Sequence, residues 1–178
     1  MSDQPVQLQI HPTSARPGVE QLTFKSARDG QGVQVRFDLV ANLSALKLPE
    51  MPGGQRRGGL WQHTCFEAFF ATAGAPGYVE FNFAPNGDWA AYQFSDYRQG
   101  GCDLDTPAPV IEAWRTTDGF SMCVTLPELP VTLKSAAVCI GPSAVIEASD
   151  GTKSYWALHH PANKPDFHRI ENFKLSLD

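Results

Sequence analysis

Four turn dipeptides constrain the fold of this chain more than any other feature. Each lies between two short runs of β-prone residues: Asp29-Gly30, Asn86-Gly87, Asp118-Gly119 and Asp150-Gly151. Such pairs suit tight hairpins, because the central residues of the favoured turns need positive φ angles. With the run from Trp61 to Phe70, the sequence offers nine or ten short strands. We therefore expect an all-β fold, an antiparallel jelly-roll-like β-sandwich.

Size and composition exclude several classes of protein. A chain of 178 residues with 42% hydrophobic and 19% charged residues is typical of a folded protein, and we expect one domain over residues 1–178. The net charge of -5 argues against a nucleic-acid partner. No apolar run is long enough to span a bilayer, so we expect no membrane partner.

The N-terminus and the cysteines favour a cytoplasmic location. The opening residues, MSDQPVQLQIHPTS, lack the charged start, apolar middle and cleavage site of a signal peptide. The four cysteines are scattered and form no CxxC motif, so we expect reduced thiols and no zinc framework: Cys65, Cys102, Cys123 and Cys139.

The hairpin around Asn86-Gly87 predicts a specific surface. A two-residue turn places Asn82 opposite Ala91, and alternation along the strands then puts Trp89 on one face with Glu80 and Asn82. Aromatic rings interleaved with hydrogen-bonding groups suit a polar ligand that also has flat apolar faces. The other face is predicted to be the core side, with Val79, Phe81, Phe83, Ala90, Tyr92 and Phe94.

A second acidic side chain is expected near this surface. If the strand of residues 61–70 pairs with that of residues 78–84, Glu67 lies beside Glu80. Two such carboxylates repel each other unless a shared proton, a cation or hydrogen-bond donors intervene. The pair is compatible with an ion-pair network on a wet sheet face, with a ligand site, or with the closely spaced carboxylates of a retaining glycosidase.

The C-terminal histidines offer a metal-binding alternative. His160, Asp166 and His168 carry the ligand types that zinc, iron or copper prefer. The competing interpretation is that these histidines tie loops together through hydrogen bonds.

Four segments together resemble the bacterial DOMON-like family, which is related to the family 9 carbohydrate-binding modules. They are LWQHTCFEAFF (60–70), YVEFNFAPNGDWAAYQFSDYR (78–98), SAVIEASDGTKSYWAL (143–158) and HHPANKPDFH (159–168). The resemblance spans about Leu8 to Phe173. It implies a jelly-roll-like sandwich with a ligand site on one sheet face or at its rim, and its members bind sugars or haem.

The resemblance also implies roles for individual residues. Trp61 and Glu67 match a tryptophan and a glutamate of the next strand that clasp a sugar ring in the modules. Glu80 or Asn82 matches a polar residue from the following strand. Trp156 matches a late tryptophan that completes the ring sandwich. Trp89 belongs to the hairpin prediction alone.

These observations predict a non-catalytic domain that binds a carbohydrate-like small molecule and needs no cofactor. Arg57 is expected nearby, and His160 to complete the ligand set. Arg56 or Arg57 could contact a phosphate of a sugar phosphate or nucleotide sugar. The alternatives are metal or haem binding through the C-terminal histidines, hydrolysis by Glu67 and Glu80, and docking of another protein. For haem the methionines beyond the initiator are Met51 and Met122, with no marked partner histidine.

Overall fold

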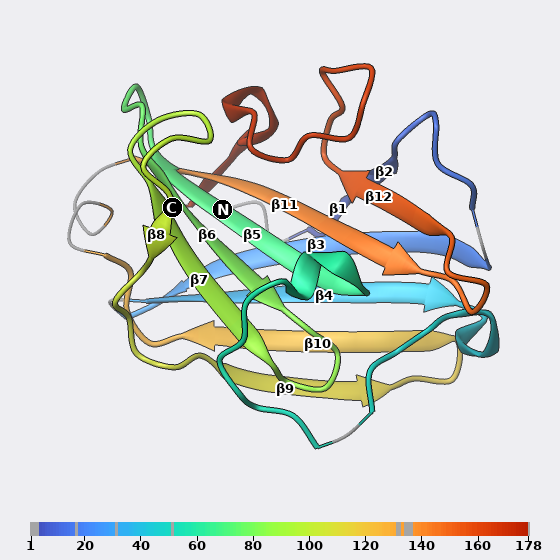
Figure 1. Cartoon of the computed structure of the whole chain (residues 1–178). Helices are drawn as coiled ribbons and strands as arrows, with labels where there is room; N and C mark the ends of the chain where they lie inside the picture. Colours follow the sequence, from blue (N-terminus) through green and yellow to red (C-terminus); the bar gives the residue numbers. More distant parts are fainter. Residues whose placement is uncertain are drawn as a thin grey trace.

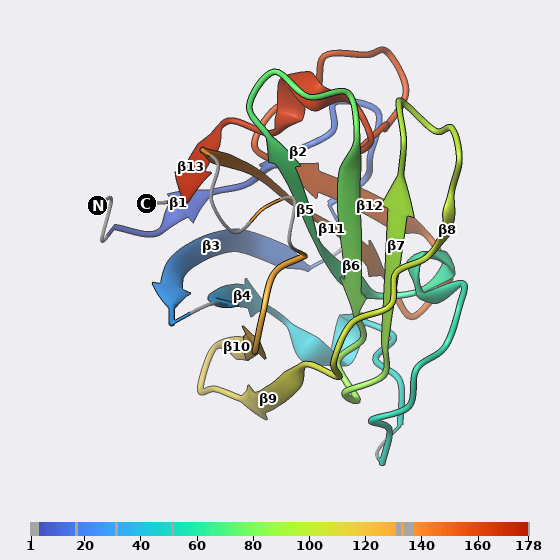
Figure 2. The same ribbon diagram turned by 90° about the vertical axis from the view of Figure 1, so that its left-hand side faces the viewer.

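Two antiparallel sheets pack face to face in the computed structural model, which describes residues 4–16, 18–30, 32–50, 52–130, 133 and 137–177. The smaller sheet has the strand order β1 (Val6–Gln7), β3 (Val19–Asp29), β4 (Gly32–Ala41), β10 (Gly119–Leu126) and β9 (Val110–Arg115). The two layers are seen from different sides in Figures 1 and 2.

The larger sheet carries the candidate site. Its strand order is β2 (Gln9–Ile10), β12 (Lys153–Ala157), β11 (Val138–Glu147), β5 (Cys65–Thr72), β6 (Tyr78–Phe83), β7 (Trp89–Phe94) and β8 (Cys102–Asp103). A last strand, β13 (Leu175–Leu177), also pairs with β11. Three short 3-10 turns complete the regular elements: η1 (Leu43–Ala45), η2 (Leu60–Gln62) and η3 (Ile170–Asn172).

The hairpin prediction is confirmed at all four turn dipeptides. They join the antiparallel neighbours β3–β4, β6–β7, β9–β10 and β11–β12. Three of the strands in the described part of the chain are only two residues long, and ten are longer. The antiparallel β-sandwich expected from the sequence is therefore the observed fold.

The main hydrophobic core lies between the sheets. Alternate residues of every long strand point into it, because successive side chains of a strand face opposite sides. Its largest fully buried members are Trp156, Phe24, Phe37, Phe66, Phe70, Phe81, Phe83 and Met122. Burial of each such side chain contributes about 1.5–3 kcal/mol relative to exposure.

A smaller apolar cluster lies on the outer face of the larger sheet. Phe69 and Tyr78 from the sheet pack there with Phe167 and Phe173, which come from the segment after β12. The rings of Phe69 and Phe173 stack with their centroids 5.5 Å apart. This cluster holds the C-terminal segment over one end of the sheet face, which in Figure 2 is drawn in orange and red beside β5 and β6.

The register of the β6–β7 hairpin differs from the predicted one. Phe83 pairs with Trp89 and Asn82 with Ala90. The backbone N–H of Ala84 donates to the carbonyl oxygen of Asp88 at 2.8 Å, so the loop holds the three residues 85–87, of which Gly87 has a φ of 90°. A three-residue loop ends with such a left-handed glycine, whereas the sequence analysis assumed a two-residue turn. The shift of one residue reverses the facing of every side chain of β7.

Because the side chains of β7 face the opposite way, the predicted positions of its aromatic residues are wrong. Trp89 lies in the main core with 6% of its surface exposed, and not on the face of Glu80. Tyr92 and Phe94, predicted to be core residues, lie on the outer face with Glu80 instead.

No helix among the described residues is both long and apolar enough to cross a membrane. The four cysteines are unpaired.

Candidate functional site

A cleft of about 580 Å³ opens on the outer face of the larger sheet. Glu67 of β5, Glu80 of β6, Tyr92 of β7 and Val145 of β11 line it from the sheet. The remaining lining residues come from η2, from the end of β7 and the loop after it, from β12 and from the segment that follows it: Trp61, Phe94, Arg98, Tyr155, Pro165, Phe167 and His168. Segments far apart in the sequence therefore share one hollow.

A polar row crosses the sheet at this cleft. Strand pairing places Ser143 beside Glu67 and Glu67 beside Asn82, with Glu80 two residues further along β6. The Ser143 hydroxyl lies 3.1 Å from Glu67 Oε2, and Asn82 Nδ2 donates to Glu80 Oε1 at 2.9 Å. Asn82 Oδ1 is buried without a hydrogen-bond partner among the described residues. The row thus supplies several hydrogen-bonding groups in a largely dry setting.

Burial raises the pKa of both carboxyl groups in the cleft. It raises the pKa of Glu80 to about 7 and the pKa of Glu67 well above its usual range, where the charge of Glu80 adds to the effect. Within the described part of the chain, neither group pairs with a lysine or arginine, so the expected surface ion pairs are not what stabilises them. A protonated carboxyl group can both donate and accept a hydrogen bond.

His168 closes one end of the polar row. Burial, together with the positive charge of Arg98, lowers the pKa of His168 to about 4, so its ring is neutral at pH 7. The Tyr78 hydroxyl accepts from the backbone N–H of Arg98 at 3.1 Å and lies 2.8 Å from His168 Nδ1. We therefore assign the Tyr78 hydroxyl as the donor and Nδ1 as the acceptor, which leaves the N–H of Nε2 facing Glu80 Oε2 at 3.8 Å.

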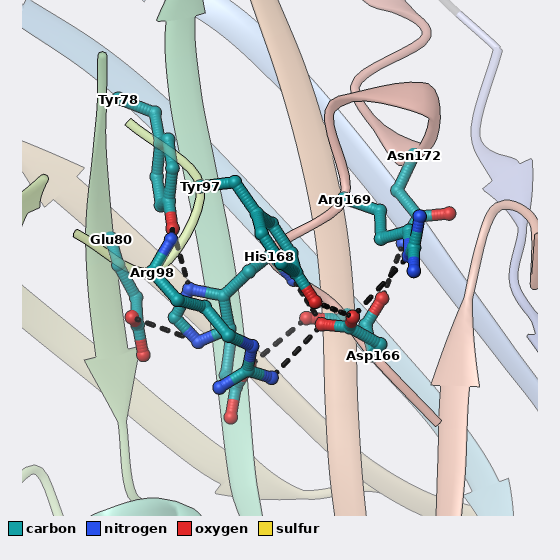
Figure 3. A network of polar contacts seen from close by, with 10 residues as sticks. Tyr78, Glu80, Tyr97, Arg98, Asp166, His168, Arg169 and Asn172 are labelled. Carbon is teal, nitrogen blue, oxygen red and sulfur yellow. Dashed lines mark hydrogen bonds and ion pairs between the residues drawn. The ribbon is translucent and has the colours of Figure 1, made fainter. Parts of the chain in front are cut away.

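Asp166 ties together the two segments that border this end of the cleft. Figure 3 shows Tyr97, Arg98 and Arg169 converging on its carboxylate. The Tyr97 hydroxyl donates at 2.5 Å and Arg98 at 2.9 Å, while Arg169 Nε lies at 3.4 Å. Burial alone would raise the Asp166 pKa, but the hydrogen bonds from Tyr97 and Arg98 lower it below its usual value. The contact joins the β7–β8 loop to the segment before η3.

The predicted pair of sugar-clasping tryptophans is wrong. Trp61 stands at the cleft with 55% of its surface exposed, whereas Trp156 is 1% exposed and packs in the main core. Its indole Nε1 donates to Ser154 Oγ at 2.9 Å. Alternation along β12 turns the preceding residue, Tyr155, to the cleft instead.

Two other predicted residues lie away from the cleft. Arg57 Nε lies 3.3 Å from Asp88 Oδ2 and does not line the cleft. His160 Nε2 lies 2.8 Å from the carbonyl oxygen of Gln9, with its ring edge-on to that of His11. Neither side chain lines the cleft, because loop geometry that the sequence pattern does not encode places both of them.

The structure does not bring together the side chains that the metal and haem alternatives require. His168 faces Glu80 and Asp166 binds basic side chains, while His160 belongs to a different contact. Among the described residues, no three His, Cys, Asp or Glu side chains gather as a metal site would require. Met122 is fully buried in the core, and Met51 lies outside the described residues.

The sequence analysis missed the aromatic lining of the cleft. Tyr92 and Phe94 were assigned to the core, and Tyr155 and Phe167 were not singled out. A three-residue turn at the β6–β7 hairpin would have exposed the first two to the cleft. Nothing in the sequence of β12 distinguishes Tyr155 from its neighbour Trp156, since both are large and β-prone.

No protein-family model matches the chain, and comparison with curated proteins finds no significant match. Two solved structures share its fold. A candidate carbohydrate-binding protein from Bacteroides uniformis superposes with a TM-score of 0.62 at 12% identity, over 96% of this chain and 87% of that one. A family 9 carbohydrate-binding module from Caldicellulosiruptor kristjanssonii, in complex with cellotriose, gives a TM-score of 0.57 at 11% identity, over 96% and 80%.

The expected relation to family 9 modules is thus confirmed at the level of the fold. The narrower assignment to the DOMON-like family stays a prediction.

Proposed function

We propose that the cleft binds a carbohydrate and that the protein is a non-catalytic binding domain. The observation that carries the proposal is the exposed indole of Trp61 beside a sheet face that offers carboxyl and amide groups. Sugars present flat apolar faces to aromatic rings and hydroxyl groups to polar partners, and this combination matches the lining. The names of the two similar structures, which mention carbohydrate binding, support the same ligand class.

The electrostatics favour a neutral sugar. Protonated Glu67 and Glu80 donate to ligand oxygen atoms as well as accept from hydroxyl groups. The same burial argues against hydrolysis, because a glycosidase pair needs one carboxylate ionised at the working pH. Glu80, with a pKa of about 7, is mostly protonated below that pH.

Calorimetric titration with a panel of sugars, sugar phosphates and nucleotide sugars tests the proposal. Trp61→Ala should weaken binding of the active compound about 5- to 30-fold, since ring stacking is worth about 1–2 kcal/mol. The thermal midpoint should stay unchanged, because the indole is largely exposed.

Trp114→Ala is the matched control. This tryptophan is 40% exposed and lies on β9 of the smaller sheet, so its loss should leave the affinity unchanged. A panel in which no compound binds would contradict the carbohydrate assignment. Steady cleavage of a bound oligosaccharide that Glu80→Gln removes would contradict the non-catalytic role.

A further inference from the structure

A second hollow adjoins the cleft and takes no part in the function proposed so far. This groove has a volume of about 670 Å³ and lies between the loops on either side of η2, the tip of the β6–β7 hairpin and the end of β11. Its lining includes Lys47, Arg57, Leu60, Gln62, His63 and Glu147. About half of the lining residues belong to the Gly- and Pro-rich loop of residues 47–59.

The groove and the cleft follow one another along the same sheet face. Val145 lines the cleft and Glu147 lines the groove. Residues two apart in a strand share a face and lie about 7 Å from each other. Above the sheet, Trp61 lines the cleft while its neighbours Leu60 and Gln62 line the groove. The single turn η2 is therefore the ridge between the two hollows.

The charges in the groove are compensated internally. Lys47 Nζ and His63 Nδ1 lie 3.1 and 2.7 Å from the Glu147 carboxylate, and Arg57 pairs with Asp88. The side chains of the two acids are only 6% and 8% exposed, whereas the three basic residues are more than half exposed.

Buried carboxylates thus hold exposed nitrogen atoms at the groove wall. Because Lys47 and Arg57 are each paired with a buried carboxylate, the wall suits neutral oxygen acceptors better than a free anion. Hydroxyl and ether oxygens of a sugar are acceptors of this kind, and the exposed amide of Gln62 adds both a donor and an acceptor.

We propose that the groove is a second subsite for the same ligand, so that the protein binds a neutral oligosaccharide across the ridge at Trp61. One sugar unit occupies the cleft, the chain passes beside the indole, and the following units contact Gln62 and His63. This inference rests on the carbohydrate function proposed for the cleft. It extends that function from a single sugar to a chain, because two adjoining hollows share one exposed aromatic residue at their boundary.

Calorimetry with matched neutral series, from monosaccharide to tetrasaccharide in gluco, manno, galacto and xylo forms, tests the second subsite. In the series that binds, the affinity of the native protein should rise about tenfold from monosaccharide to trisaccharide, as expected for one or two added hydrogen bonds. The double variant Gln62→Ala/His63→Ala should lose this gain and keep the monosaccharide affinity.

The variant is expected to fold, because Lys47 still pairs with Glu147. Gln62→Ala alone, at an exposed position, gives the same test with a smaller change. Gln34→Ala, an exposed glutamine on β4 of the other sheet, is the control and should keep the full gain.

The outcomes separate the two proposals. Equal affinity for monosaccharide and trisaccharide, or a gain that survives in the double variant, overturns the second subsite and leaves the cleft as the binding site. A complete lack of binding in every series contradicts the carbohydrate function of the cleft itself, and the second subsite with it.

Discussion

The two faces of the larger sheet bury their side chains to a similar degree, but burial affects apolar and carboxyl side chains in opposite ways. On the inner face Trp89 and Trp156 are 6% and 1% exposed, and the smaller sheet covers them with apolar side chains. On the outer face Glu67 and Glu80 are 3% and 5% exposed. There the cover comes from loops and the C-terminal segment, which leave the cleft open above the carboxyl groups.

Burial stabilises the inner face, since it removes apolar surface from water. On the outer face the same degree of burial opposes ionisation and raises the pKa of the carboxyl groups. A low exposed fraction therefore does not distinguish a core from a binding site. The distinction lies in which groups are buried and in whether empty space remains next to them.

Of the variants that compare the two faces, Trp156→Ala is expected to change the stability most. Removal of a fully buried indole should lower the free energy of unfolding by about 3–5 kcal/mol, because it leaves a cavity in the core. Urea denaturation measures the change. The matched Trp61→Ala variant, at the exposed position, should change the same free energy by less than about 0.5 kcal/mol. Equal losses in the two variants would contradict the difference between the inner and outer faces.

Glu80→Gln tests how much the burial of this carboxyl group destabilises the folded protein when the group ionises. Below pH 4.5, the ordinary pKa, Glu80 is protonated in both the folded and the unfolded state. Between pH 4.5 and about 7 the unfolded state releases the proton first, so the stability falls as the pH rises and levels off above that range. Glu80 should account for about 3 kcal/mol of this loss in urea denaturation, and the variant should lose less than the native protein by about that amount, since only the contribution of Glu67 remains.

Glu147→Gln is the control, because the pKa of Glu147 is shifted in the opposite direction. Burial alone would raise the Glu147 pKa, but hydrogen bonds from His63 and Lys47 lower it. Its contribution is therefore present above its ordinary pKa and lost as the pH falls, so the variant should be less stable than the native protein at neutral pH. An identical pH profile for the native protein and Glu80→Gln would show that Glu80 ionises normally.

Gly87→Ala tests the left-handed backbone conformation at the tip of the β6–β7 hairpin. With a φ of 90°, this position should lose about 1–2 kcal/mol of stability when it gains a Cβ atom. Gly87→Asn should recover part of the loss, because asparagine tolerates the left-handed region. Thermal or urea denaturation measures both, and an unchanged stability in Gly87→Ala would contradict the positive φ at this position.

The strands themselves could be predicted because their signals are local. Turn chemistry at four Asx-Gly dipeptides and period-two alternation, as in Val33, Val35, Phe37 and Leu39, act within a few residues. The pairing of β5 with β6, which brings Glu67 near Glu80, followed from the same local pattern.

The candidate site was predicted only in part. Trp61, Glu67, Glu80 and Asn82 meet at or beneath the cleft, as the resemblance to family 9 modules implied. Trp89 was misplaced because a one-residue error in turn length reverses a whole strand.

The amino-acid sequence by itself determined the class of fold and the grouping of Glu67, Glu80 and Asn82, since both depend on hairpins between neighbouring strands. Only the tertiary structure decided which tryptophans are buried, how Asp166 joins two distant segments, and which loops surround the cleft. Those features depend on packing between segments far apart in the sequence, such as Asp166 and Arg98 with their separation of 68 residues. Contacts of that range leave no periodic trace in the sequence, because each partner alone is compatible with many neighbours.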